Sequence, residues 1–285
     1  MATAVRRDAA GGEVRRAVAI GVACALLTLF FFVVRFPYDV FRASLVGQLA
    51  AATGAELAIG SLRGGLSLGG PALVAEPVTM KWPGGTSADL TRAALRPAWS
   101  PSWLRGQPAL HVDLEAPAGR VVGTLWPGEA VAFQGAVKEL ALEQLPPAVL
   151  EAAQGIALTG ILDADLDLSL QAGAPAGGIE IDLANGAFSA PGLPVSIPFE
   201  RLQAVLDLGE GALRIGSAAL EGPMVAGTAQ GKIALTSDPG LDLQVELRVP
   251  DPNMRQMVAP LGIRLDGEGR AKLQIKGTFS NPIVR

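Results

Sequence analysis

The sequence predicts a mainly β protein: an N-terminal transmembrane helix followed by a curved, largely antiparallel β-sheet body with two or three short helices. Two observations lead to this prediction. Residues 17–34 form an uncharged apolar run that is long enough to cross a membrane. Further along, apolar and polar residues alternate in several stretches, as they do in strands with one wet face. Long helical segments do not separate these stretches, which disfavours a doubly wound α/β fold.

The apolar run is predicted to anchor the chain over residues 17–36, with residues 1–16 in the cytoplasm and a β-rich domain over 37–285 in the periplasm. Basic residues before a span keep that end cytoplasmic, so the body is exported from a bacterial inner membrane. A cleaved signal peptide is the alternative, but the run exceeds the usual apolar region and no small-x-small site follows directly. The orienting residues are Arg6, Arg7, Arg15 and Arg16, and the anchor residues include Ala17, Leu26, Phe30, Phe31, Phe32 and Val34.

Residues 38–52 are predicted to form a helix just outside the membrane. Apolar residues recur there at helical spacing, and Asp39 can cap the start. The recurring residues are Val40, Phe41, Leu45 and Leu49. This helix either rests on the bilayer or plugs one end of the β body, and its low charge favours the plug.

The body is predicted to be an antiparallel sheet with meander-like connections. Strict alternation marks the strands, and Gly, Pro, Asn and Asp punctuate them. The clearest strands are 163–170, 179–183, 241–249 and 271–276. Short helices are expected at 142–153 and 251–259, with a sub-boundary near 140–155.

The apolar face of such a sheet must curl on itself, pack against another sheet, or hold something apolar. A packed sandwich or a closed barrel is the favoured expectation, because the core is the commoner place for aliphatic side chains. The alternative is an open groove that holds acyl chains.

The composition argues against several kinds of chemistry. Net charge is −4 and no basic stripe is present, so nucleic acid is not an expected partner. The single histidine, His111, rules out a His-rich metal site and limits acid–base catalysis, and a surface position is expected for it. No cofactor and no enzymatic activity are expected.

Two short patterns have ordinary structural readings. Asp163, Asp165 and Asp167 lie on one strand face, but they break the calcium-loop pattern and fit a solvated face better. Residues 227–232 resemble a phosphate loop only loosely and fit a hairpin turn.

Four tryptophans stand out, because aromatic residues make up only 5% of the chain. They are candidates for a partner surface, although core filling and contact with the bilayer remain alternatives. These residues are Trp82, Trp99, Trp103 and Trp126.

Four stretches of the chain carry a resemblance to known proteins. Phe36-Pro37 begins the exported part, residues 99–106 carry a Pro, a Leu and a Gly before a strand, and 119–126 form the strand expected to follow. Residues 269–282 form a Gly-rich terminal strand that ends in Asn-Pro. Together these stretches resemble the type II secretion system protein N family and the related AsmA-like proteins, whose repeats frequently end in such a strand. The resemblance covers nearly the whole chain, and neither family supplies catalytic residues.

The resemblance implies two functions of different classes. The secretion family implies an accessory inner-membrane component of the type II secretion system, a periplasmic scaffold that contacts other secretion subunits. The AsmA-like relatives imply a lipid-binding or lipid-transfer protein of the cell envelope, with phospholipid as ligand. A hydrolase built on His111 is the third hypothesis, and no assembled motif supports it.

Overall fold

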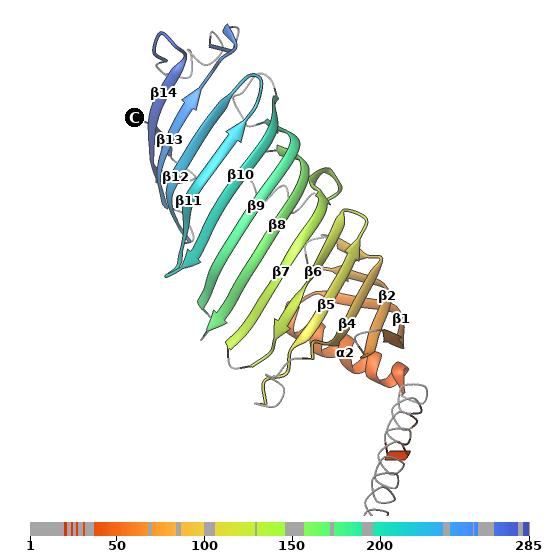
Figure 1. The fold of residues 1–285 in the computed structure, drawn as a ribbon. Helices are drawn as coiled ribbons and strands as arrows, with labels where there is room; N and C mark the ends of the chain where they lie inside the picture. The colour runs from red at the N-terminus through yellow and green to blue at the C-terminus, as the bar shows by residue number, and fades with distance from the viewer. Residues whose placement is uncertain are drawn as a thin grey trace, which may run out of the picture.

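The computed structural model describes most of the chain as one antiparallel sheet (Figure 1). The described residues are Ile20, Gly21, Cys24, Leu27, Phe31, 37–67, 70–83, 87–99, 106–128, 130–145, 157–171, 174–189, 196–235, 240–252, 254–255, 265–278 and 282–284. The prediction of a mainly β body with an antiparallel meander is therefore confirmed. Three of the four strands predicted from alternation lie within strands of the structure, and the fourth, 241–249, extends one residue beyond the end of β13 at Arg248.

Among the described residues the sheet has 15 strands, and its order follows the sequence with one exception, because β3 and β4 both pair with β2. The strands of the first half are β1 (Glu56–Ser67), β2 (Gly70–Lys81), β3 (Ser87–Leu90), β4 (Arg92–Pro97), β5 (Leu110–Ala116), β6 (Gly119–Trp126), β7 (Ala130–Ala141) and β8 (Ala157–Gln171). Those of the second half are β9 (Ala174–Ser189), β10 (Ile197–Gly209), β11 (Ala212–Glu221), β12 (Ala226–Ala234), β13 (Gly240–Arg248), β14 (Arg270–Thr278) and β15 (Pro282–Val284).

The favoured expectation of a sandwich or a closed barrel is wrong. The described strands form a single sheet with β1 at one end and β15 at the other, and these two end strands do not pair with each other. In Figure 1 the labelled strands follow one another along the sheet from β1 to β14, and all described strands belong to this one sheet. Alternation predicts which residues share a face, but it does not tell whether that face is covered.

The helix α2 (Tyr38–Thr53) matches the predicted helix over 38–52. It ends at Gly54, whose positive φ of 66° suits glycine and whose N–H donates to the carbonyl of Ala50. The helix packs against β1, where Arg42 donates a hydrogen bond of 2.8 Å to the carbonyl of Gly60. Val40 is 71% exposed, so the predicted apolar stripe does not face the sheet at this residue.

The other predicted helices are described only in part. A 3₁₀ helix, η2 (Leu142–Gln144), begins the first of them, and residues 146–156 lie outside the described part of the chain. Pro252, Met254 and Arg255 are helical in the second, and 256–264 lie outside it.

The predicted anchor, residues 17–36, falls mostly outside the described residues. Its described members, Ile20, Gly21, Cys24, Leu27 and Phe31, are helical. Within the described part of the chain, no helix is both long enough and apolar enough to cross a membrane. The predicted topology residues Arg6, Arg7, Arg15 and Arg16 lie outside it too, as do Ala17, Leu26, Phe30, Phe32 and Val34.

Two small patches on the sheet are fully covered. In one, Leu183 and Phe199 pack with Leu142 of η2 and are 1%, 4% and 7% exposed. In the other, Val249 and Met254 pack with Val225, next to the short helical segment. These patches are the cores of the described structure, and Leu183 and Val249 are its largest fully buried side chains.

Candidate functional site: the aliphatic row

Strand register aligns apolar residues into one row that crosses twelve strands, which we call the aliphatic row. Each member is the direct cross-strand neighbour of the next, from β2 to β14. The row comprises Leu73, Leu95, Val112, Gly123, Gly135, Leu166, Ile179, Leu206, Ile215, Gly231, Leu243 and Ile275. At roughly 4.8 Å per strand, eleven steps give a length of about 53 Å along the sheet.

Bulges keep the apolar residues further along three strands on the same face as the row. Alternation alone would send Ile215 and Ala218 of β11 to opposite faces, but the register shifts between them and restores both to the apolar side. Similar shifts occur on β7, near Glu139, and on β9, near Asn185. Both residues have positive φ angles, 52° and 51°, as bulge residues can. At each shift the strand contains one extra residue. Without it, the apolar side chains beyond that point would lie on the polar face.

Glycines and one aromatic ring complete the row at β6 and β7. Gly123 and Gly135 face each other there, and the Phe133 ring covers both. A β-carbon at Gly123 or Gly135 would lie 2.6 or 2.8 Å from the Phe133 ring, so neither position has room for a side chain. The ring replaces the aliphatic surface that two glycines omit.

The side chains of the row are half-buried, in contrast to the two covered patches. No row member with a side chain reaches full burial, although each is flanked by apolar neighbours on its own face. Leu183 lies on the same strand face as Ile179 but is 1% exposed, because η2 and Phe199 cover it. The row therefore lies beside the covered patches and is not part of them.

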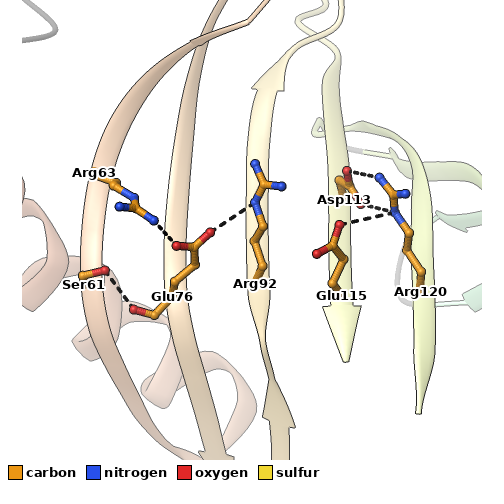
Figure 2. Close-up of polar contacts among 7 residues, drawn as sticks. All are labelled: Ser61, Arg63, Glu76, Arg92, Asp113, Glu115 and Arg120. Atoms are coloured by element: carbon orange, nitrogen blue, oxygen red, sulfur yellow. Dashed lines mark hydrogen bonds and ion pairs between the residues drawn. The ribbon is translucent and has the colours of Figure 1, made fainter. Parts of the chain in front are cut away.

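The opposite face is polar and carries ion pairs. Near the β1 end, Glu76 lies between two arginines: Arg63 of β1 contacts it from one side, and the Arg92 Nε lies 3.3 Å away on the other (Figure 2). Arg120 donates to both carboxylate oxygens of Asp113, at 2.7 and 2.6 Å. Each pair joins side chains of neighbouring strands, which is the way in which charges stabilise a sheet.

The ion pair lowers the pKa of Asp113, because Arg120 hydrogen-bonds the ionised carboxylate. Burial lowers the pKa of His111, and the charge of Arg96 opposite adds to this effect. His111 is half-buried rather than on the open surface, and Asp113 is engaged by Arg120. Asp113 therefore hydrogen-bonds Arg120, whereas in a Ser-His-Asp triad the aspartate hydrogen-bonds the histidine.

The main hollow of the polar face, 1310 Å³ in volume, carries charges of both signs. Asp163 and Asp165 line it together with Arg120 and Lys138, and the oxygen of Asp163 accepts a hydrogen bond from the Glu139 N–H at 2.9 Å. No group of three or more potential metal ligands occurs among the residues that the structure describes. The hollow is a solvated, mixed-charge surface.

The three tryptophans that the structure describes do not gather at one place. Trp82 follows the end of β2, whereas Trp99 lies over Gly70 at the start of that strand. Trp126 ends β6 and is half-buried, Trp99 is 64% exposed, and Trp103 lies outside the described residues. A partner surface that includes Trp82 would be separate from one that includes Trp99.

No model of a protein family matches the sequence. No curated protein and no solved structure matches it either. The resemblance to the type II secretion system protein N family therefore stays a prediction, and the arguments below start from the geometry of the sheet.

Sequence reasoning identified the alternation of these strands, but it missed the row itself. The cross-strand alignment of distant residues, such as Leu73 with Leu95, depends on turn lengths and bulges. The signal in the sequence was that each strand carries apolar residues at every second position. The pairing of the strands aligns these residues into one row.

Proposed function

We propose that this chain is a non-enzymatic protein of the cell envelope whose aliphatic row holds the acyl chains of lipids. The observation that supports it is the half-buried state of the row on a sheet whose described end strands do not close. Aliphatic side chains offer no hydrogen-bonding groups, so the surface suits hydrocarbon and not polar ligands. The predicted inner-membrane anchor and periplasmic body would place this surface beside a lipid source.

The dimensions of the row suit an acyl chain. Its length of about 53 Å exceeds the roughly 30 Å hydrocarbon thickness of a bilayer, which two acyl chains span end to end. A chain that crosses the four strands from β8 to β11 would cover four half-buried side chains, each contributing about 1 kcal/mol. These are Leu166, Ile179, Leu206 and Ile215. Association costs offset much of this gain, so a lipid with two acyl chains, both on the row, binds better than a single fatty acid.

The test is native mass spectrometry of the full chain purified in mild detergent, followed by lipid extraction. The wild type is expected to retain phospholipid at near-stoichiometric levels. Leu206→Asp, which places a charge in the row, is expected to lose most of it. Val205→Asp is the matched control, because Val205 is the adjacent residue on the polar face and is 42% exposed. A lipid-free wild type, or equal retention in both variants, contradicts the proposal.

A scaffold role in the type II secretion system rests on the resemblance alone. Its mechanism would be the docking of another secretion subunit on an edge of the sheet. The C-terminal edge carries features that discourage docking: β15 has three residues and begins with proline, and β14 presents Lys272 and Lys276. Recovery of secretion subunits with the full chain from membranes tests this role separately from lipid retention.

A further inference from the structure

The N-terminal edge of the sheet, strand β1, differs from the C-terminal edge. It has 12 residues, and within the described part of the chain it pairs with a strand on one side only, β2. Half of the backbone N–H and C=O groups of such a strand point away from its partner and are available to a further strand. On this outer side, α2 supplies the hydrogen bond from Arg42 to Gly60, near the start of β1.

The second half of β1 has a sequence that is nearly the same in both directions. It runs Ser61, Leu62, Arg63, Gly64, Gly65, Leu66, Ser67. If two copies pair antiparallel about Gly64, serine faces serine and leucine faces leucine. Arg63 then faces Gly65 of the other copy, so the two arginines do not oppose each other. Like charges directly opposite would destabilise the pairing, and this register avoids them.

We propose that two copies of this chain associate through their β1 strands, antiparallel about a two-fold axis at Gly64. Such a contact uses the same patch on both copies and closes on itself, so it yields a dimer and not a fibre. The alignment of Ser61–Ser67 with its own reverse favours a second copy over an unrelated strand. The occupied edge also removes a long open template for aggregation.

The geometry at Gly65 provides a charge test. A β-carbon there would meet only the carbonyl of Ala72, at 4.0 Å, and Gly65 has no positive φ. A side chain is therefore tolerated in the isolated chain. In the dimer, residue 65 of each copy faces Arg63 of the other, so any charge placed at 65 acts twice.

Three matched variants of the full chain, Gly65→Lys, Gly65→Gln and Gly65→Glu, are compared with the wild type by sedimentation velocity in mild detergent over a concentration series. Dimerisation is expected to be weakest for Gly65→Lys, intermediate for Gly65→Gln and strongest for Gly65→Glu. The dissociation constants of the lysine and glutamate variants should differ by about tenfold or more.

Two outcomes overturn the proposal. One is a wild type that stays monomeric across the series, and the other is an equal or reversed order of the lysine and glutamate variants. Far-UV circular dichroism confirms that each variant keeps the sheet. Lipid retention is measured on the same samples, so failure of the dimer and failure of lipid binding are seen separately.

Discussion

The contrast between Leu183 and Leu206 predicts two different costs for the same substitution. Both leucines lie on the apolar face of neighbouring central strands, but Leu183 is 1% exposed and Leu206 is half-buried. Leu183→Ala removes a side chain enclosed by Leu142 and Phe199 and leaves a cavity, which costs about 3 kcal/mol. Leu206→Ala removes a side chain that is partly in contact with solvent or ligand, at a cost of about 1 kcal/mol.

Thermal unfolding of the full chain, followed by far-UV circular dichroism in one detergent, measures both costs. For a domain of this size, 1 kcal/mol shifts Tm by roughly 2–4 °C. Leu183→Ala should therefore lower Tm by roughly 6–12 °C and Leu206→Ala by roughly 2–4 °C. Equal losses would refute the reasoning, because they would mean that the aliphatic row is covered as completely as the patch around Leu183.

Two further predictions concern the strands and their charges. Gly177→Ala should destabilise the fold by about 1–3 kcal/mol, because Gly177 has a φ of 143° and an added β-carbon would collide with the Asp167 carbonyl. Its neighbour Gly178 has nothing within 4 Å of that position, so equal loss of Tm in Gly178→Ala would contradict the argument. Folding lowers the pKa of Asp113, because Arg120 hydrogen-bonds its carboxylate. The ion pair therefore stabilises the folded state above about pH 4, and this stabilisation is lost as the pH falls through the lower pKa of the folded state. Asp113→Asn should flatten that part of a stability–pH curve measured with urea, and an unchanged slope would show that the pair does not couple to folding.

Local sequence was enough to predict the strands, because alternation such as that of residues 163–170 reports which side chains share a face. It was not enough to predict closure, which depends on whether β1 and β15 meet after thirteen intervening strands. The bulges near Glu139 and Asn185 were also missed, since a bulge is one extra residue that leaves no mark in composition. Trp82 and Trp99 lie at opposite ends of β2, Trp82 after its last residue and Trp99 over Gly70, and this separation follows from the pairing of the strands and not from sequence spacing.

The proposed dimer and the proposed lipid surface meet at Gly64. This residue pairs with Leu73, the first member of the aliphatic row, so Gly64 lies where the row reaches the β1 edge. A two-fold axis perpendicular to the sheet at Gly64 keeps both apolar faces on the same side and sets the two rows end to end. The joined surface would run for roughly 120 Å, about 4.8 Å per strand over 25 steps. Glycine at the junction leaves no side chain to interrupt hydrocarbon that passes from one copy to the other. Substituting leucine for Gly64 would fill that junction on the apolar face. A charge at Gly65 acts instead on the polar face and changes the association of the two copies. Variants at the two positions therefore test the continuity of the row and the formation of the dimer independently.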